Sequence, residues 1–458
     1  MVRVDTQYVA GSTPFVPEPA FVGWRRYYFP HPLWVLPVLF FLFWSFSGSM
    51  QIRQDLLRSF YGSQAQLYNN MPLGVTGILG FFTTPLLGVL SDRWGRKPVL
   101  IICCVVLACP VQLLWLLDLS RNAACMKVFL VFEALQVTGG LGSVIGICFT
   151  YLADILPPAQ RAAVSGLIMA FGCGFGQIFG PIFFAKMYAN GESEDSKQLA
   201  ILCWAVSMMI LVSMAVIIPE SFPTHRRDVQ PRSCPNPLHG FHLLFSVEAP
   251  QTRYSFRLLF TLVLIIYGVK IGMLASLGLF SMQVYSFTTT QSSWLTSVFG
   301  LSQLVGQMCI PILLKVFSHK QVIVFGCLMG VLAAALPAIP GIPGAVLFAS
   351  EALLALTFIS YVISVSLATQ LVPASRMGEA AATIQAAANL SAGIGPLVFG
   401  ALSIFFVQTP YPGGVLLIMT GLLLVALFMC LRLPNDEMIA ELRKHLTSAA
   451  VEVAQVTV

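Results

Sequence analysis

Three ionisable side chains lie inside long apolar stretches of this sequence: Glu133, Lys270 and Glu351. A charged side chain that faces lipid near the centre of a bilayer costs about 3 kcal/mol, so each should face a cavity or a charged partner. We predict that Lys270 pairs with one glutamate while the other gains and loses a proton, because burial favours a neutral carboxyl group and pairing favours a charged one. The alternative is that both glutamates lie near the ends of their helices, are wetted by solvent and are structural.

Uncharged polar side chains occur in the same apolar stretches. They could contact a molecule bound in a cavity, although such side chains more often form hydrogen bonds between helices. These candidates are Gln136, Ser143, Gln303, Gln307, Gln385 and Asn389. The six histidines are scattered without metal-ligand spacing, and the phosphate-binding pattern Gly-x-x-x-x-Gly-Lys does not occur. We therefore expect no enzyme chemistry, no metal, no cofactor and no ATP site.

A second concentration of charge lies in a short turn between two apolar stretches. Its glycines allow a sharp turn between helix ends, and its charges could form contacts in one of two conformations and break them in the other. The alternative is that the basic residues only anchor the chain at a membrane surface. The residues of this turn that we expect to act together are Gly88, Asp92, Arg93, Gly95, Arg96 and Lys97.

The composition indicates that these residues are positioned by membrane-spanning helices. Hydrophobic residues make up 57% of the 458 residues and charged residues only 10%, which excludes an ordinary soluble protein. The net charge of +6 comes from basic residues spread over many short loops, so it indicates membrane topology rather than nucleic-acid binding. A helix needs about 20 apolar residues to cross a bilayer. The predicted helices are centred on residues 33–50, 70–90, 98–117, 127–152, 162–185, 199–218, 256–280, 292–314, 321–339, 345–370, 380–406 and 413–432.

A proline-rich polar segment divides these predicted helices into two sets of six. Lys and Arg are far more numerous in the loops on the side that holds both chain ends, so both termini are predicted to be cytoplasmic. The predicted parts are an N-terminal segment (1–30), a first bundle (31–218), a central loop (219–253), a second bundle (254–432) and a C-terminal tail (433–458).

The two predicted bundles repeat short motifs in the same order. A proline turn precedes Arg161 in the first half and Arg376 in the second, and we expect both arginines to form ion pairs at the cytoplasmic surface. Each arginine is followed by a Gly-Pro pair, Gly180-Pro181 and Gly395-Pro396. Small residues let helices pack closely and a proline kinks a helix, so these pairs are predicted pivots. Such repeats are typical of membrane proteins whose halves rock about a central site.

The turn from Gly88 to Pro98 resembles the signature loop between the second and third helices of the major facilitator superfamily. The end of the sixth helix, Ile218 to Ser221, resembles the branch of tetracycline exporters and hippocampus-abundant-transcript proteins. The resemblance implies an all-α membrane protein with twelve transmembrane helices in two six-helix bundles. It also implies that Asp92 lies near the start of the eleventh helix, that Arg96 pairs with Asp154, and that these contacts hold the cytoplasmic side shut.

Helices one, four, seven and ten line the central cavity in the family that this sequence resembles, which places Glu133, Lys270 and Glu351 there. The resemblance implies a secondary active transporter that moves a small organic solute across a lipid bilayer by alternating access. Proton-coupled antiport is one such mechanism. However, Leu135 stands where related exporters carry an arginine, and the stretch from Leu33 to Met50 contains no acid. The alternatives are a facilitative uniporter or importer of a metabolite (a sugar, an amino acid or an organic anion) and a non-transporting membrane sensor or scaffold.

Overall fold

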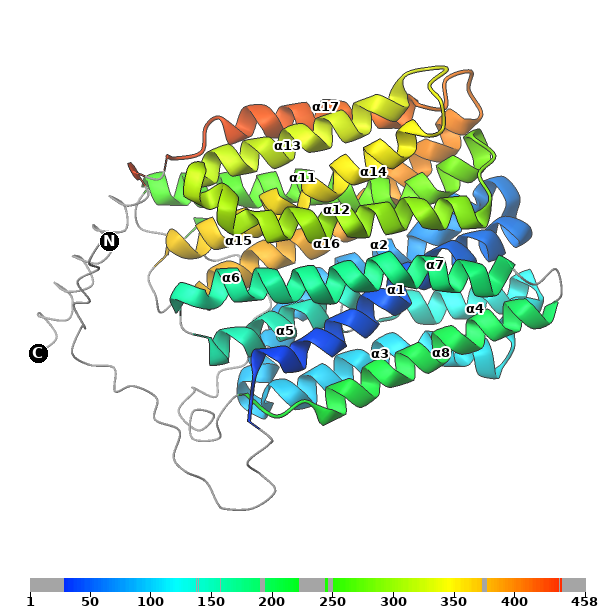
Figure 1. Cartoon of the computed structure of the whole chain (residues 1–458), viewed down its shortest axis with the longest axis horizontal. Helices are drawn as coiled ribbons and strands as arrows, with labels where there is room; N and C mark the ends of the chain where they lie inside the picture. Colours follow the sequence, from blue (N-terminus) through cyan, green and yellow to red (C-terminus); the bar gives the residue numbers. More distant parts are fainter. Residues whose placement is uncertain are drawn as a thin grey trace, which may run out of the picture.

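The computed structural model describes residues 29–136, 138, 140–156, 158–189, 194–221, 244–245, 250–372, 377–435 and 437–438. Within these residues the fold is all-α and contains no strand. The helices form twelve passes across the molecule, six in each half, as predicted (Figure 1). Nine of the described helical runs are long and apolar enough to cross a membrane, and Gly140–Ile155 and Gly414–Cys430 are shorter apolar helices.

The first half contains two interrupted passes. One consists of α4 and α5, and the other of α6, the π-helical segment η5 and α7. The helices of this half are η2 (Pro32–Trp34), α1 (Val35–Tyr61), η3 (Gly62–Gln64), α2 (Ala65–Trp94), α3 (Arg96–Leu116), η4 (Leu119–Arg121), α4 (Ala123–Ala134), α5 (Gly140–Ile155), α6 (Pro158–Met169), η5 (Ala170–Gly174), α7 (Phe175–Ala189) and α8 (Glu194–Ile217).

The second half repeats this arrangement, with one pass interrupted between α14 and α15. Its helices are α11 (Pro250–Val284), α12 (Thr289–Val316), α13 (His319–Ala335), η6 (Leu336–Ala338), α14 (Val346–Leu356), α15 (Phe358–Gln370), α16 (Met377–Val407) and α17 (Gly414–Cys430).

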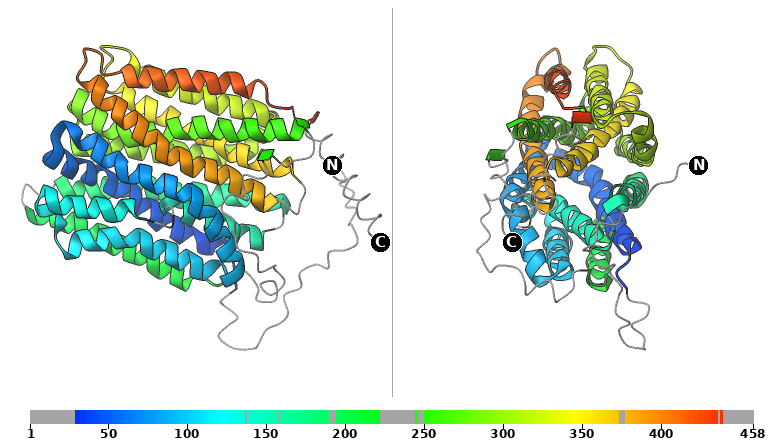
Figure 2. Two further views of the ribbon diagram at one scale, coloured as in Figure 1. Left: turned by 180° about the vertical axis from the view of Figure 1, so that it is seen from behind. Right: turned by 90° about the vertical axis from the view of Figure 1, so that its left-hand side faces the viewer.

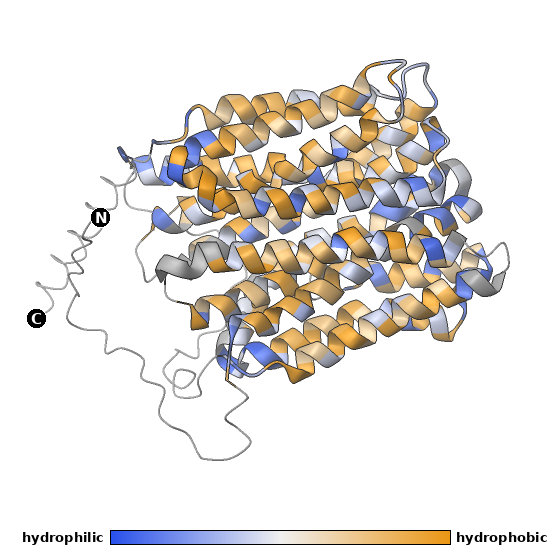
Figure 3. Ribbon diagram, in the orientation of Figure 1, coloured by the Kyte–Doolittle hydropathy of each residue, from blue (hydrophilic) through white to orange (hydrophobic). Residues whose placement is uncertain are grey.

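The two halves lie side by side with their helices roughly parallel (Figures 1 and 2). We call the side on which α1 begins at Val35 and α17 ends at Cys430 the near side, and the opposite side the far side. The near side is at the left of Figure 1. Large apolar side chains are exposed on both halves, for example Phe179, Phe405 and Phe428. Hydrophobic residues predominate along the helices of both halves (Figure 3). Lipid is the solvent that such a surface requires.

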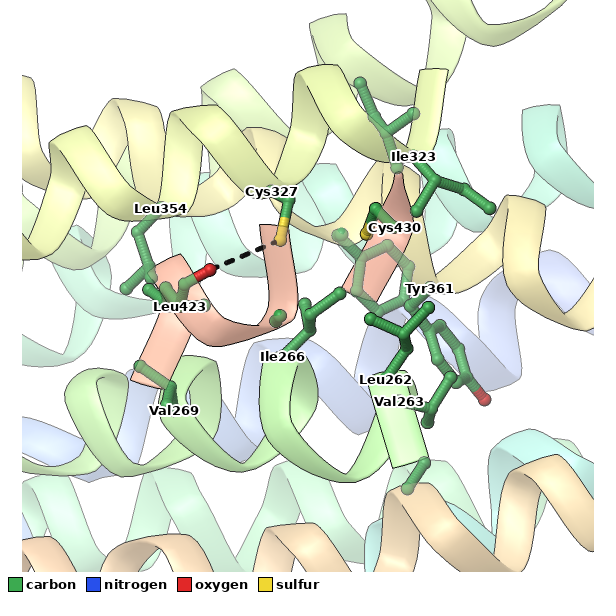
Figure 4. Close-up of a cluster of buried hydrophobic side chains, with 14 of the residues drawn as sticks. Leu262, Val263, Ile266, Val269, Ile323, Cys327, Leu354, Tyr361, Leu423 and Cys430 are labelled. Carbon is green, nitrogen blue, oxygen red and sulfur yellow. Dashed lines mark hydrogen bonds between the residues drawn. The ribbon is translucent and has the colours of Figure 1, made fainter. Parts of the chain in front are cut away.

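Each half has its own apolar core. In the second half, Leu262 and Ile266 of α11 pack with Ile323 and Cys327 of α13 and with residues of α14 and α17 (Figure 4). The Cys327 thiol donates a weak hydrogen bond to the carbonyl oxygen of Leu423, at 3.9 Å. Because each half buries its own core, each can keep its shape if the halves move relative to each other.

Glycines bring the two halves together at two places, where α2 meets α16 and where α7 meets α12. A Cβ added at Gly393 of α16 would lie 2.6 Å from the carbonyl oxygen of Gly74 in α2. A Cβ added at Gly300 of α12 would lie 2.7 Å from the Cβ of Gln177 in α7. Both distances are too short for a real side chain, so these contacts require glycine.

Two predicted helices differ from the structure. The first helix extends beyond the stretch 33–50 on which it was predicted to centre, because α1 continues to Tyr61 with Arg53 and Gln54 buried. The predicted helix over 127–152 is interrupted between α4 and α5, where Gly140 has a φ of 61°. A polar stretch can continue a helix when its side chains find partners inside the protein, which hydropathy does not record.

Candidate functional site

Lys270 lies in the middle of α11 and is surrounded by aromatic rings. Its side chain is almost fully buried, at 4% exposure. Its Nζ lies 3.9 Å from the ring centroid of Phe358, 5.4 Å from that of Phe299 and 5.5 Å from that of Tyr267. We call these three rings the aromatic cage. Ring faces attract a cation, and no carboxylate of the described residues lies within ion-pair distance of the Lys270 amine.

Buried polar atoms that lack a hydrogen-bond partner occur in the helices around the cage. Glu351 of α14 is 2% exposed and lies close enough to Lys270 for their charges to interact. Its Oε2, and both amide atoms of Gln307 in α12, have no hydrogen-bond partner among the described residues. Gln307 and Gln303 lie on the same helix face as Phe299, at a spacing of four residues. A buried unpartnered polar atom costs about 1–3 kcal/mol, so these atoms indicate a place where water or a solute binds.

A chain of hydrogen bonds joins the aromatic cage to the first half. The Tyr361 ring lies 5.0 Å from that of Tyr267, and its hydroxyl donates to Gln385 Oε1. From there Gln385 Nε2 donates to Asn389 Oδ1 at 3.3 Å, and Asn389 Nδ2 donates to Thr84 Oγ1 at 2.8 Å. The last link, at 3.1 Å, joins the Thr84 and Ser143 hydroxyls. We call Tyr361, Gln385, Asn389, Thr84 and Ser143 the central polar chain.

Glu133 is paired with Arg53, not with Lys270. Arg53 Nη1 donates to Glu133 Oε1, and Arg53 Nη2 donates to the carbonyl oxygen of Asn69 at 2.6 Å. Arg53 is 7% exposed and Glu133 is half-buried, so the pair lies largely out of solvent between α1, α2 and α4. Gln136, 6% exposed, lies in the break that follows α4, three residues after Glu133 in the sequence. The predicted pairing of Lys270 therefore does not involve Glu133 in this structure.

Hydrogen bonds join the two halves in the far-side part of the molecule. Gln66 Nε2 donates to the carbonyl oxygen of Ala275 at 3.3 Å and to Ser276 Oγ at 3.1 Å. Nearby, Asn70 Nδ2 donates to the carbonyl oxygen of Pro396 at 2.8 Å. These amide side chains are buried. Buried polar contacts therefore join the far-side end of α2 to α11 and α16.

On the near side, the structure shows the predicted contact between Arg96 and Asp154. Arg96 Nε lies 2.9 Å from Asp154 Oδ2, and Arg96 Nη1 donates to Ser91 Oγ at 2.6 Å. Arg96 is 5% exposed. This ion pair joins the end of α2, the start of α3 and the end of α5, all in the first half. The role of the pair in gating stays a prediction.

A carboxylate from the end of the first half holds the start of α3. Glu220 accepts hydrogen bonds from the backbone N–H groups of Arg96 at 2.9 Å and Lys97 at 3.2 Å. The first N–H groups of a helix have no partner within the helix, and its dipole favours a negative charge there. Gly95, with a φ of 104°, makes the turn that precedes α3. At Gly88, in contrast, a Cβ would meet nothing within 4 Å, so close packing does not require that glycine.

Both predicted pivots are places of close packing. A Cβ at Gly180 would lie 2.6 Å from the carbonyl oxygen of Trp44 in α1, and a Cβ at Gly395 would overlap the backbone of Gly268 in α11. Each Gly-Pro pair thus packs against the first helix of its own half. Pro181 lies inside α7, just after η5, and Pro396 lies inside α16. The close contacts are present, and pivoting stays a prediction.

Some predicted gating residues cannot be placed. The side chains of Asp92 and Arg161, and the whole of Arg376, fall outside the part of the chain that the structure describes. The exposed fraction of Arg93 is intermediate. The contact of Asp92 with the start of the eleventh helix therefore stays a prediction.

Several residues of the site were not predicted from the sequence. Arg53 lies outside the predicted apolar stretch 33–50, and the cage rings Phe299 and Phe358 look like ordinary core residues. Thr84 and Tyr361 of the central polar chain likewise have nothing in the sequence that marks them as site residues. The signal in the sequence was the predicted buried lysine itself, because ring faces attract a cation and are one way to stabilise it in an apolar surrounding.

Comparisons with known proteins agree with this architecture. The model of the family described as Major Facilitator Superfamily matches residues 4–181 and 258–452. The Hippocampus abundant transcript 1 protein of Homo sapiens is 24% identical over 346 residues, which cover 74% of this chain and 66% of that protein. The chain thus spans just under two thirds of that relative. The class C tetracycline resistance protein of Escherichia coli is 26% identical over 283 residues, covering 60% of this chain and 63% of that protein.

A solved structure has the same fold. The crystal structure of the human organic anion transporter MFSD10 superimposes with a TM-score of 0.63 at 18% sequence identity, covering 87% of this chain and 98% of that one. The family match extends over both halves, which together form the twelve-pass arrangement. The chain is therefore an integral, multi-pass membrane protein that belongs to the Major Facilitator Superfamily of transporters.

Proposed function

We propose that this protein is a secondary active transporter that moves a small organic solute by alternating access. The supporting observation is the position of the aromatic cage and Lys270. The central polar chain connects the cage to α2 and α5 of the first half. The site is therefore shared by two halves, each of which has its own core. Movement of one half against the other would expose it to either side.

The solute that fits this site best carries a negative charge. Among the described residues the Lys270 amine has no paired carboxylate, whereas the buried Arg53 has Glu133. An anionic group beside the amine would supply the missing partner, and the cage rings would contact an apolar or aromatic body. The similar fold of the human organic anion transporter supports the same class of solute.

Orientation is the second part of the proposal. The near side is cytoplasmic, because the near-side loops hold most of the Lys and Arg residues. The buried amides that join α2, α11 and α16 then close the site toward the other side of the membrane. Arg96 and Asp154 stabilise the near-side helix ends of the first half. Together with Asp92, Arg161 and Arg376, they are the proposed cytoplasmic gate.

Lys270 provides the direct test of solute binding. Purified protein is screened by thermal shift against a panel of aromatic and aliphatic carboxylates, with uncharged analogues of the same size. The proposal predicts stabilisation by carboxylates, which Lys270→Gln abolishes and Lys315→Gln, a change at the near end of α12, leaves intact. Equal stabilisation of wild type and Lys270→Gln by every active compound would contradict it.

Proton coupling distinguishes the leading mechanism from the second candidate, a facilitative uniporter. Leu135 replaces the arginine of related exporters, which favours the uniporter, whereas the unpartnered Oε2 of Glu351 offers a proton site. Uptake into proteoliposomes is measured with an imposed pH gradient and after an ionophore collapses it. An exporter that exchanges solute for protons loses concentrative transport, and a uniporter equilibrates the solute at the same rate in both conditions.

A further inference from the structure

A second basic site lies on the outer surface of the second half, far from the aromatic cage. A groove of about 540 Å³ runs between α11 and α17 at their near-side ends. Four residues of α11, three of α17 and one just beyond the end of α17 form its walls, at spacings that place them on one side of each helix. They are Tyr254, Arg257, Leu258 and Thr261 of α11 and Val425, Phe428, Met429 and Arg432 of the α17 end.

The two arginines lie at the depth of lipid headgroups. The 35 residues of α11 make a helix of about 52 Å, longer than the ~30 Å hydrocarbon core, so its first turns extend into the interface. Arg257 lies two turns into α11, and Arg432 lies two residues beyond the end of α17. Thr261 and Val425 lie deeper on the same two helices, toward the hydrocarbon.

Arg257 is held in place by the protein. Its Nε donates to the carbonyl oxygen of Leu244 at 2.7 Å, and its guanidinium lies 5.1 Å from the ring centroid of Phe245. These contacts fix the side chain before any ligand binds, which lowers the entropy cost of binding. Lys320 adds a positive charge nearby, where its Nζ donates to the carbonyl oxygen of Leu431 at 2.7 Å.

We infer that this groove binds an anionic phospholipid of the near-side leaflet. The guanidinium groups of Arg257 and Arg432 would bind the phosphate, because a planar guanidinium can donate two parallel hydrogen bonds to phosphate oxygens. The hydroxyls of Tyr254 and Thr261 can donate to the glycerol or headgroup oxygens. Phe428 and Val425, 67% and 51% exposed, provide the apolar surface for an acyl chain. A soluble phosphate would use the arginines but not this surface.

The inference is independent of the solute proposed above, and lipid binding tests it directly. Full-length protein in neutral detergent is titrated with phosphatidylglycerol or phosphatidylcholine, and bound lipid is counted by native mass spectrometry. We expect one phosphatidylglycerol to bind more tightly than phosphatidylcholine. The apparent affinity should fall about fivefold in Arg432→Gln, as expected for one interfacial arginine. Lys315→Gln, which removes a near-side charge outside the groove, should leave the affinity unchanged.

Two further measurements keep the inference testable if a charge variant is unstable. Phe428→Asp should also weaken phosphatidylglycerol binding, because it places a like charge on the acyl surface. Glycerol 3-phosphate at the same concentration should not raise the unfolding temperature. Equal lipid binding by wild type, Arg432→Gln and Phe428→Asp would overturn the inference. An equal loss in Lys315→Gln, or an equal shift by glycerol 3-phosphate, would overturn it as well.

Discussion

Arg53 and Lys270 both carry buried positive charges, but their surroundings differ. Arg53 has a carboxylate, Glu133, and a backbone carbonyl, so its charge is compensated within the protein. Lys270 has ring faces, and the nearby Glu351 forms no ion pair with it among the described residues. A compensated pair serves structure, whereas an incompletely compensated charge leaves interaction energy available for a ligand. This difference is the reason for assigning a structural role to the first site and a binding role to the second.

Removing one member of the Arg53–Glu133 pair should be worse than removing both. Arg53→Gln leaves a largely buried carboxylate without its cation, which is expected to cost about 3 kcal/mol of stability, the low end of the range for breaking a buried pair. The double variant Arg53→Met, Glu133→Leu removes both charges and should recover most of that loss. Thermal unfolding in detergent measures both. If the double variant were as unstable as the single one, the pair would not be compensated as described.

Arg96 should not be replaceable by lysine. Its guanidinium contacts Asp154 through Nε and Ser91 through Nη1, and a lysine amine cannot reproduce that fork. Arg96→Lys should cost about 2 kcal/mol of stability and slow solute uptake. Lys97→Gln is the matched control, because the contact of residue 97 with Glu220 is made by its backbone N–H. A similar effect of both changes on unfolding temperature would contradict the assignment.

The contact between Arg96 and Asp154 could be predicted because a family resemblance supplied it. The partner of Glu133 could not, because it is 80 residues away in a stretch that reads as a polar loop. Glu220 shows the same limit, since a helix cap supplied from 124 residues away leaves no local pattern. Sequence reasoning therefore found which residues are unusual more readily than it found what they contact.

The packing of whole helices depends on a few glycines. Gly77 and Gly393 let the backbones of α2 and α16 touch, and Gly300 does the same for α12 against α7. These contacts join the halves, so they must adjust if the halves rock. Hydropathy located the helices themselves well. It missed the break at Gly140 and the extension of α1 past Met50, because burial of the polar side chains there is decided by neighbouring helices.

A side chain at the α2–α16 contact should therefore block movement between the halves. In Gly393→Val the new atoms would meet the Gly74 carbonyl oxygen and the Ile78 amide. We therefore expect this overpacking to cost about 1–3 kcal/mol of stability and to lower the transport rate strongly. Gly421→Ala in α17 is the control, since a Cβ there meets nothing within 4 Å. Transport by Gly393→Val at the rate of Gly421→Ala would show that this contact is not part of the moving interface.

The molecule as a whole consists of two similar halves joined by polar contacts in its far-side part. Each Gly-Pro pair packs on the first helix of its own half, which is the relation that a repeated unit predicts. The buried amides of Gln66 and Asn70 hold the far ends of the two halves together. In the alternating-access account these bonds must break during each cycle, so that the far side can open.

Crosslinking Gln66→Cys to Ser276→Cys tests this account most directly. These side chains are 3.1 Å apart across the two halves, and a short thiol crosslinker in a background without native cysteines would fix them. The matched control is Gln112→Cys with Ala205→Cys, a pair joined by a 2.8 Å hydrogen bond within the first half. The account predicts that the first crosslink stops solute uptake into proteoliposomes and that reduction restores it, while the control crosslink has no effect. Uptake at the full rate with Gln66 and Ser276 crosslinked would contradict the account.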